Sequence, residues 1–348
     1  MPERITGLDI GGAHLKLAQV EPDGRVVTAL QVPCALWQGL DRLDEALARA
    51  LAAALPVTTT AITMTGELVD LFPDRPTGVT RLVEAVTAAL PQARHHLWAG
   101  RHGFVAAAEA ATCAGAVASA NWLAAAGLAA SVAKEGVFLD LGSTTLDVLV
   151  LQGGEVRALG LTDRERLATG ELVYTGLSRT PLMALARRAP FAGRWVGVMN
   201  EHFATTADLY RLLGRLEEET DQHPAADNGP KTQEASARRL ARMIGADLDD
   251  ADLDHWQALA AWFARRQARL IEDALDLQLS RGLVQASAPL IGAGCGRFLI
   301  ADLAARLGRP YRDFTALVDA TPAARPWIAT CAPAVAVAVL AAGTTAPD

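Results

Sequence analysis

The sequence predicts an α/β protein made of two duplicated lobes. The chain has 348 residues, and one ordinary core uses only about 100 to 200 residues, so two lobes with a cleft between them are expected. A β-hairpin pattern with an aspartate and a glycine at its turn occurs twice, and a glycine-rich strand-to-helix turn follows late in the chain. We expect the first lobe at residues 1–130 and the second at 131–348, with a loop-rich region at 160–235 that carries specificity.

The spacing of apolar residues predicts the elements of the first lobe. Alternating residues around glycine turns favour a three-stranded meander, and leucines and alanines at helical spacing favour the helices that follow. In chain order, we expect strands at 5–10, 15–20 and near Val26, a helix at 40–55, a strand at 59–64, a helix at 79–90, and one or two packed helices within 106–134.

The second lobe begins with a meander that repeats the first. DIGGAHLKLAQV from Asp9 and DLGSTTLDVLVL from Asp140 share the aspartate, the glycine two residues later and a polar eighth residue, which indicates an internal duplication. We expect strands at 137–141, 146–152, 155–159 and 286–291, and helices at 234–244, 255–281, 298–307 and after Pro333.

Composition excludes several classes of function. The formal net charge is −7 and the sequence pI is about 5.6, whereas a general nucleic-acid binder needs a basic face to replace counterions. The start MPERITGLDIGG lacks a signal-peptide pattern, and the alanine-rich stretch 105–133 is too weakly apolar for a membrane span. Four scattered cysteines without a CxxC pair indicate neither zinc nor disulfides. We therefore expect a cytoplasmic protein that binds neither nucleic acid nor membranes.

Each hairpin carries groups that suit phosphate and magnesium. An aspartate at the end of the first strand, followed by glycines, lies beside unoccupied backbone N–H groups, and such nests bind phosphate oxygens. Carboxylates at Asp9, Asp140 and Asp147 would hold hydrated Mg²⁺, and Lys16 would neutralise phosphate charge. One such hairpin is common, but two copies 131 residues apart indicate a site. The predicted phosphate-binding residues are Gly11, Gly12, Ala13, His14, Lys16, Gly142, Ser143, Thr144, Thr145 and Lys231.

A third motif, PLIGAGCGRFLIADLAARLG, runs from a strand through Gly292, Gly294 and Gly296 into a helix. A dinucleotide-binding fingerprint would stand near the start of a βαβ unit, and here only about 50 residues remain to complete a sheet. We therefore interpret these glycines as a loop for a nucleotide or for another part of the substrate.

The order of hairpin, hairpin and glycine loop resembles the actin, Hsp70 and sugar-kinase superfold, which is a duplicated ribonuclease H-like fold. Within this superfold, the chain is similar to the methanofuran-biosynthesis condensing enzymes of the hydantoinase and oxoprolinase branch. The bacterial relatives of these enzymes occur together with the tetrahydromethanopterin-linked pathway of one-carbon transfer. The family pattern has Asn and Thr where this chain has His14 and Leu15, and Thr at Leu146. The matching segments, which span nearly the whole chain, include GLDIGGAHLK, MTGELVDLFPDRPTGV, FLDLGSTTLD, ATGELVYTGLSRTP, NEHFATTADLYRLLG and DNGPKTQEASARRLARMIG.

The resemblance implies a transferase that joins an aminomethylfuran-methyl diphosphate to (γ-glutamyl)tyramine, forms an aryl ether and releases pyrophosphate with Mg²⁺. These two small molecules are the expected partners. A homodimer is a further possibility that the sequence does not decide. A phenol has a pKa of about 10, so a base is expected near its proton. The candidate catalytic residues are Glu201, His202 and Glu171, with His14 behind them, and Lys16 for the leaving diphosphate.

Other interpretations remain open at this point. One is an ATP-dependent kinase or hydantoinase-like enzyme of the same superfold, in which the glycine loop holds adenosine. Another is a nucleotide-switched scaffold of actin or Hsp70 type. Among single residues, Glu201 and His202 are also explained as an ordinary loop before a helix that Thr205 or Thr206 caps. Asn121 beside Trp122 is interpreted as structural.

Overall fold

A computed structural model describes residues 3–344 of the protein. Its first sheet has the strand order β3-β2-β1-β4-β5-β6. The central strand β1 is antiparallel to β2 and parallel to β4. The strands are β1 (Ile5–Ile10), β2 (His14–Val20), β3 (Val26–Pro33), β4 (Thr59–Met64), β5 (Arg94–Trp98) and β6 (Phe104–Ala106).

The second sheet repeats this arrangement with the order β10-β8-β7-β13-β14. Its central strand β7 is antiparallel to β8 and parallel to β13, as β1 is to β2 and β4. The predicted duplicated ribonuclease H-like fold is therefore confirmed. The strands are β7 (Gly136–Leu141), β8 (Leu146–Gln152), β10 (Leu172–Val173), β13 (Leu290–Ala293) and β14 (Tyr311–Asp313), with the short β9 (Glu155–Val156) paired to β8.

Two apolar helices lie between the sheets. α4 (Asn121–Ala133) packs on β7 and β8, α10 (Ala332–Thr344) packs on β1, β2 and β4, and the two helices pack on each other. The sequence of α10, APAVAVAVLAAGT, carries no charge, as expected for a helix that is buried on all sides. One core cluster accordingly contains residues of both lobes. The predicted boundary between residues 130 and 131 stays a prediction, and its outer ends, residues 1 and 348, lie outside the described part.

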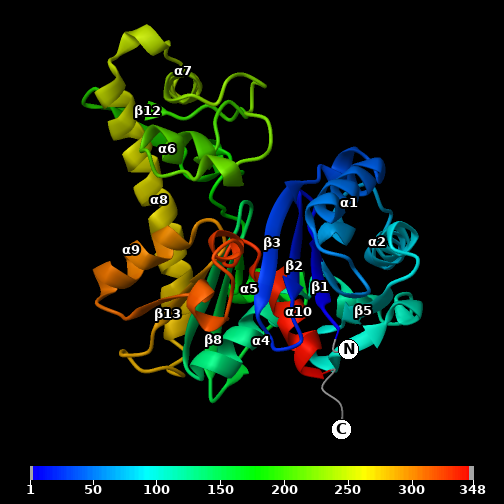
Figure 1. Cartoon of the computed structure of the whole chain (residues 1–348). Helices are drawn as coiled ribbons and strands as arrows, with labels where there is room; N and C mark the ends of the chain where they lie inside the picture. Colours follow the sequence, from blue (N-terminus) through cyan, green and yellow to red (C-terminus); the bar gives the residue numbers. More distant parts are fainter. Residues whose placement is uncertain (1–2, 345–348) are drawn as a thin grey trace.

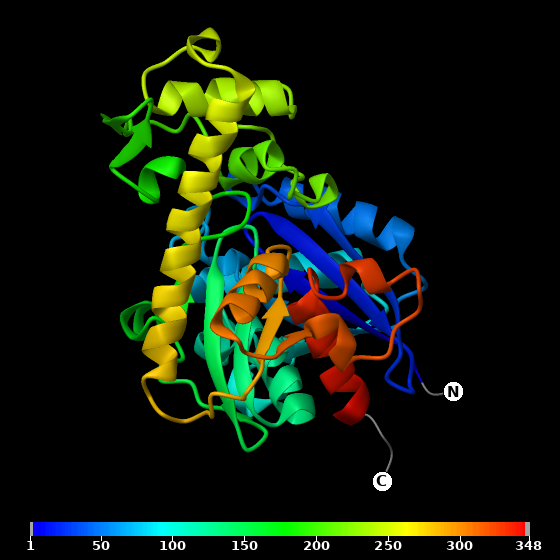
Figure 2. The same ribbon diagram turned by 90° about the vertical axis from the view of Figure 1, so that its left-hand side faces the viewer.

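The outer faces of the sheets are covered by other helices. α1 (Asp41–Ala53) packs on the first sheet and beside α2 (Arg75–Ala89). α8 (Leu253–Leu279) and α9 (Arg297–Leu307) cover the second sheet, and α8 continues beyond it into a separate cap (Figures 1 and 2). The cap has its own apolar core and contains α6 (Thr206–Leu212), α7 (Gln233–Met243), β11 (Arg188–Phe191) and β12 (Arg194–Gly197).

Most predicted elements are present, but the strand expected at 155–159 ends at Val156, and strands β5, β6 and β14 were not predicted. Two further differences lie in the second lobe. The strand expected at 286–291 is β13 at Leu290–Ala293, because residues 285–288 form a turn and the ladder with β7 begins at Leu290. The region 160–235 contains more regular structure than expected, including α5 (Asp163–Thr169) and the cap elements. Its apolar residues pack on Trp256 of α8, a contact that local sequence does not reveal. Within residues 3–344, no helix combines the length and apolarity that crossing a membrane requires.

The closest approach between α10 and the first sheet gives a test of this packing. A Cβ at Gly7 of β1 would lie 2.0 Å from the carbonyl oxygen of Ala334, so Gly7→Ala should lower the free energy of unfolding by about 1–3 kcal/mol through overpacking. Gly127→Ala in α4, where a Cβ meets nothing within 4 Å, should raise it by about 0.5–1 kcal/mol. Urea unfolding followed by circular dichroism measures both changes. Equal effects of the two variants would contradict the assigned contact.

Candidate functional site

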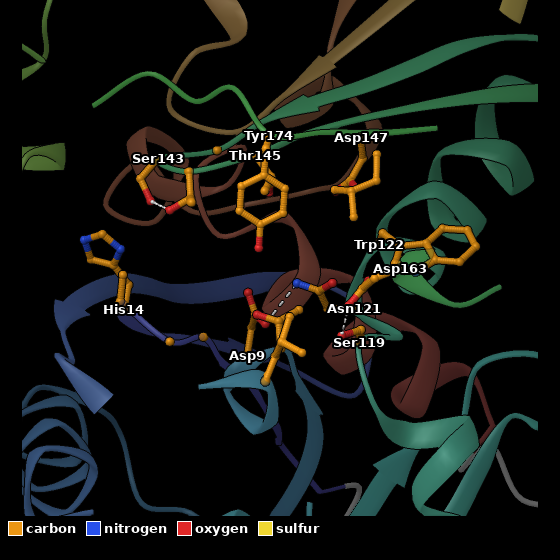
Figure 3. A pocket seen from close by; sticks show the side chains of 18 of the residues that line it. Asp9, His14, Ser119, Asn121, Trp122, Ser143, Thr145, Asp147, Asp163 and Tyr174 are labelled. Carbon is orange, nitrogen blue, oxygen red and sulfur yellow. Dashed lines mark hydrogen bonds between the residues drawn. The ribbon is translucent and has the colours of Figure 1, made fainter. Parts of the chain in front are cut away.

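The turns of the two β-hairpins face each other across a cavity of about 310 Å³ (Figure 3). The same hydrogen bond closes each turn, from Gly11 N to His14 O and from Gly142 N to Thr145 O, both over 2.9 Å. Within residues 3–344, the amides of Gly12 and Ala13, and of Ser143 and Thr144, donate no hydrogen bond. All nine predicted phosphate-binding residues of the hairpins line this cavity, namely Gly11, Gly12, Ala13, His14, Lys16, Gly142, Ser143, Thr144 and Thr145.

A buried charge cluster lies where the two hairpins meet. The strand registers pair Asp9 with Lys16 and Asp140 with Asp147, so Lys16 and Asp147 occupy equivalent positions of the duplicated hairpins. Lys16 Nζ lies 3.4 Å from Asp9 Oδ2. Burial alone would lower the pKa of Lys16, but the negative charges of Asp9 and Asp140 raise it, so Lys16 stays a cation.

The carboxylates of this cluster differ in their suitability for a metal ion. Burial raises the pKa of Asp140 to about 7 although Lys16 opposes the change, so Asp140 lacks sufficient positive charge around it. Asp147 already accepts a hydrogen bond of 2.6 Å from Arg166 Nη2. Among the described residues, no three His, Cys, Asp or Glu side chains are grouped to hold a metal by themselves. Asp9 lines the cavity, whereas Asp140 is buried and is not among the residues that line it. A Mg²⁺ held by these two carboxylates would therefore also need water and substrate phosphates, as Mg²⁺ commonly does.

The mouth of the cavity carries basic and aromatic side chains at the hairpin turns. His223, from the loop that precedes α7, donates from Nε2 to the carbonyl oxygen of Ala13 over 2.6 Å, and its ring lies 4.7 Å from that of His14. Arg179 lies over Trp37 and donates a 3.4 Å hydrogen bond to Thr144 Oγ1, and no carboxylate of residues 3–344 pairs with it. Burial lowers the pKa of Arg179, yet an arginine keeps its charge. Arg179 is therefore available to bind an anion, although it was not among the residues predicted for the phosphate site.

The opposite end of the cavity contains residues that the sequence did not assign to the site. Asn121 donates to Asp9 Oδ1 over 3.3 Å, and the guanidinium of Arg166 stacks on Trp122 at 4.0 Å. Asn121 and Trp122, interpreted from the sequence as structural, thus line the cavity. Ser119, Asp163 and Tyr174 line it as well, and the ring of Tyr174 projects into it from the second lobe (Figure 3).

Three of the predicted catalytic residues lie outside this cavity. Glu171 is fully buried, and its carboxylate accepts hydrogen bonds from the amides of Leu159 and Gly160 and from the hydroxyl of Thr169. It therefore holds a turn, and its oxygens have no free direction toward a substrate. Glu201 and His202 are exposed in the loop before α6, and Thr205 caps that helix together with Asp208.

The remaining predicted residues also have protein partners. Lys231 bonds to the carbonyl of Asp221, and its Nζ lies 3.3 Å from Asp221 Oδ2. In the glycine loop, a Cβ at Gly294 would lie 2.2 Å from the carbonyl oxygen of Leu141, and Gly294 has φ +79°. Cβ atoms at Gly292 and Gly296 would meet the side chains of Tyr311 and Leu141. Close packing of the loop on β7 and β14 thus accounts for these glycines without a ligand.

A family model and two curated relatives match this chain. Residues 58–339 match the hydantoinase/oxoprolinase family model. The chain is 30% identical over 273 residues, 78% of this chain and 81% of the relative, to a protein of Methanocaldococcus jannaschii named (4-{4-[2-(γ-L-glutamylamino)ethyl]phenoxymethyl}furan-2-yl)methanamine synthase. A protein of Methanococcus vannielii with the same name is 32% identical over 124 residues, 36% of this chain and 55% of that protein.

Among solved structures, a nucleotide-free acetone carboxylase matches with a TM-score of 0.56 and 12% identity over 96% of this chain and 70% of that chain. At this identity the match concerns the fold alone. It agrees with the two duplicated sheets described above.

His14 provides a test of the electrostatics at the mouth. Burial, followed by the charges of His223 and Lys16, lowers the pKa of His14 well below its usual value. The unfolded chain therefore binds a proton near pH 6.5 that the folded chain does not, and stability falls as the pH drops below about 6.5. We expect His14→Asn to weaken this loss in ligand-free protein. Melting temperatures between pH 5 and 8 measure it, with exposed His202→Asn as the control. An unchanged pH slope in His14→Asn would contradict the buried, neutral imidazole.

Proposed function

This chain belongs to the hydantoinase/oxoprolinase family, and from that premise we propose that it is a transferase of methanofuran-type cofactor biosynthesis. It condenses an aminomethylfuran-methyl diphosphate with (γ-glutamyl)tyramine, and the products are an aryl ether and pyrophosphate. The names of the two methanogen relatives support this choice, since each is named as a synthase of such a phenoxymethyl furan amine. The observation that carries the proposal is the pair of hairpin turns with undonated amides around Lys16.

The reaction exchanges one carbon–oxygen bond for another. The bond between the furan methylene carbon and the diphosphate oxygen breaks, and its electron pair leaves with pyrophosphate. The phenol oxygen of the tyramine then bonds to that carbon, and the phenol proton is released. A furan oxygen donates electron density to the methylene carbon, so positive charge develops there while negative charge develops on the diphosphate. The enzyme gains most by stabilising this leaving group.

The chain's own groups suit that task. The amides of Gly12 and Ala13 and those of Ser143 and Thr144 point from opposite lobes, and Lys16 and Arg179 supply positive charge. Fixed donors of this kind stabilise developing charge without rearranging during the reaction. Asp9 and Asp140 would hold Mg²⁺ beside the diphosphate, and a bound Mg²⁺ supplies further charge stabilisation for the leaving oxygens.

Proton removal requires less from the protein. Once the phenol oxygen bonds to an electron-poor carbon, its proton becomes strongly acidic, so water at the cavity mouth takes it. This explains how the reaction proceeds although Glu171 is engaged and Glu201 and His202 lie in an exposed loop. Of the four residues that the sequence suggested as bases, His14 is the one that lines the cavity. It lies at the turn of the first hairpin, where the diphosphate would bind.

The central test is release of pyrophosphate without ATP. Purified protein with Mg²⁺, the furan-methyl diphosphate and γ-glutamyltyramine should release pyrophosphate in step with a coupled product detected by mass spectrometry. Omission of either substrate should stop product formation, and EDTA should abolish it until excess Mg²⁺ is added. ADP formation on addition of ATP, with no pyrophosphate from the two substrates, would instead support an ATP-dependent enzyme of the same superfold.

Substitutions of the cavity cations should lower activity, whereas substitutions in the exposed loop before α6 should not. Arg179→Met removes a cation without leaving a paired carboxylate behind, so it should lower kcat by roughly 100-fold, the loss typical of removing one charge-stabilising donor. Lys16→Met should lower it at least as much. Glu201→Gln and His202→Asn should keep activity within about twofold of the original because exposed side chains in a loop contribute little. Steady-state kinetics and melting temperatures check both; loss of activity in the exposed pair would refute the assignment.

A further inference from the structure

The cavity has a second polar end, formed by Ser119, Asn121 and Asp163 with Glu67 behind them, and we propose that this end binds the protonated primary amine of the furan substrate. The proposal rests on the proposed function and deepens it, because it assigns the direction in which the substrate lies. Figure 3 shows Ser119 and Asp163 on the opposite side of the cavity from His14 and Ser143.

Two carboxylates converge on one hydroxyl at this end. Ser119 Oγ lies 2.8 Å from Glu67 Oε1 and 3.0 Å from Asp163 Oδ2. A hydroxyl has one proton to donate, so it can satisfy one of these carboxylates at a time. Glu67 is 1% exposed, and its second oxygen, Oε2, has no hydrogen-bond partner among residues 3–344. The group is therefore short of hydrogen-bond donors.

The charges at this end are also unbalanced. Arg75 contacts Asp163 at 2.6 Å and is the one cation that pairs with these two acids within the described chain. The neighbouring Asp147 has its own partner in Arg166. Two carboxylates against one guanidinium leave one negative charge without compensation. Burial accordingly raises the pKa of Glu67, as expected for an acid that lacks a counter-ion.

A primary ammonium supplies what is missing. It brings one positive charge and three N–H donors, enough for Asp163 Oδ2 and for the hydroxyl of Ser119, whose proton then serves Glu67. Ser119 itself has a left-handed backbone conformation with φ 50°, which is uncommon for a residue other than glycine.

The rest of the cavity fits a flat ring between the two polar ends. Tyr174 projects into the space between the hairpin turns and Asp163 (Figure 3), and Trp122 lines the cavity near Asp163. With the ammonium at Asp163, the carbon on the far side of the ring faces the hairpin amides. The cavity would thus select a furan that carries an amine at one end and a diphosphate at the other.

The competing explanation is that Asp163 and Glu67 only tie α5 and Ser119 to the first lobe through Arg75. A comparison of substrates separates the two explanations. We would measure kcat/KM of pyrophosphate release for the aminomethyl substrate and for an analogue with methyl in place of aminomethyl. Three proteins are compared: the original, Asp163→Asn, and Asp70→Asn, which removes an exposed carboxylate beside the cavity residue Val69.

For the amine substrate, Asp163→Asn should lower kcat/KM by roughly 10- to 100-fold, the range of a charge-assisted hydrogen bond. For the methyl analogue it should change kcat/KM by less than about fivefold, and Asp70→Asn should stay within that limit for both substrates. Equal losses for both substrates in Asp163→Asn would show a structural tie and overturn the proposal. Ser119→Ala, which keeps the ion pair of Asp163 with Arg75, should show the same selective loss in smaller degree.

A binding measurement keeps this test independent of the reaction. Ligand-observed NMR would follow 2-(aminomethyl)furan and furfuryl alcohol with the original protein and with Asp163→Asn. Binding of the amine in preference to the alcohol, lost in the variant, supports the ammonium site even where no pyrophosphate is released, an outcome that would reject the proposed reaction alone. Pyrophosphate release without any amine preference would reject the ammonium site and leave the reaction in place.

Discussion

The ammonium of Lys16 lies beside Asp9 and close enough to Asp140 for both carboxylates to raise its pKa, and this contact allows the two hairpins to meet. Duplication brings an aspartate to the same position in each hairpin, so two buried carboxylates meet where the lobes meet. Without a cation between them, repulsion and desolvation would oppose that approach. Lys16 occupies the first hairpin's equivalent of Asp147, so a single difference between the repeats makes their meeting favourable.

The same difference between the hairpins gives the two ends of the cavity different charges. The first hairpin supplies its own cation at Lys16, whereas Asp147 in the second takes Arg166 from α5, and that guanidinium stacks on Trp122. Basic groups without acid partners therefore gather at the hairpin turns, while acids without sufficient cations gather around Ser119 and Asp163. A symmetric pair of hairpins would bind an anion in either orientation. The departures from symmetry make the two ends of the site chemically distinct.

The sequence revealed the parts of the site that are local and repeated. Asp9, Gly11 and Lys16 stand at fixed intervals within one hairpin, and the copy at Asp140 doubles the signal, so the fold and the phosphate turns could be predicted. Arg179, Asp163 and Ser119 lie on loops and a short helix whose positions depend on tertiary packing, and no spacing rule connects them. For Glu171 and Glu201, the sequence predicted a catalytic role that their positions in the structure do not support. Their residue types suit catalysis, but burial against backbone amides in one case and exposure in the other are invisible in the sequence.

The lobes are joined in two physically different ways on the two sides of the cavity. On one side, α4 and α10 bury a continuous apolar cluster that contains residues of both sheets. Each fully buried valine, leucine, isoleucine or phenylalanine there contributes about 1.5–3 kcal/mol, and its many alanines contribute less. At the mouth, the contact includes hydrogen bonds from His223 to Ala13 and from Gln222 to Gln31 and the stacking of Arg179 on Trp37. Each such hydrogen bond is worth about 1 kcal/mol net, because water replaces it on opening. The contacts at the mouth are therefore easier to break than those of α4 and α10, and we infer that substrates enter on that side.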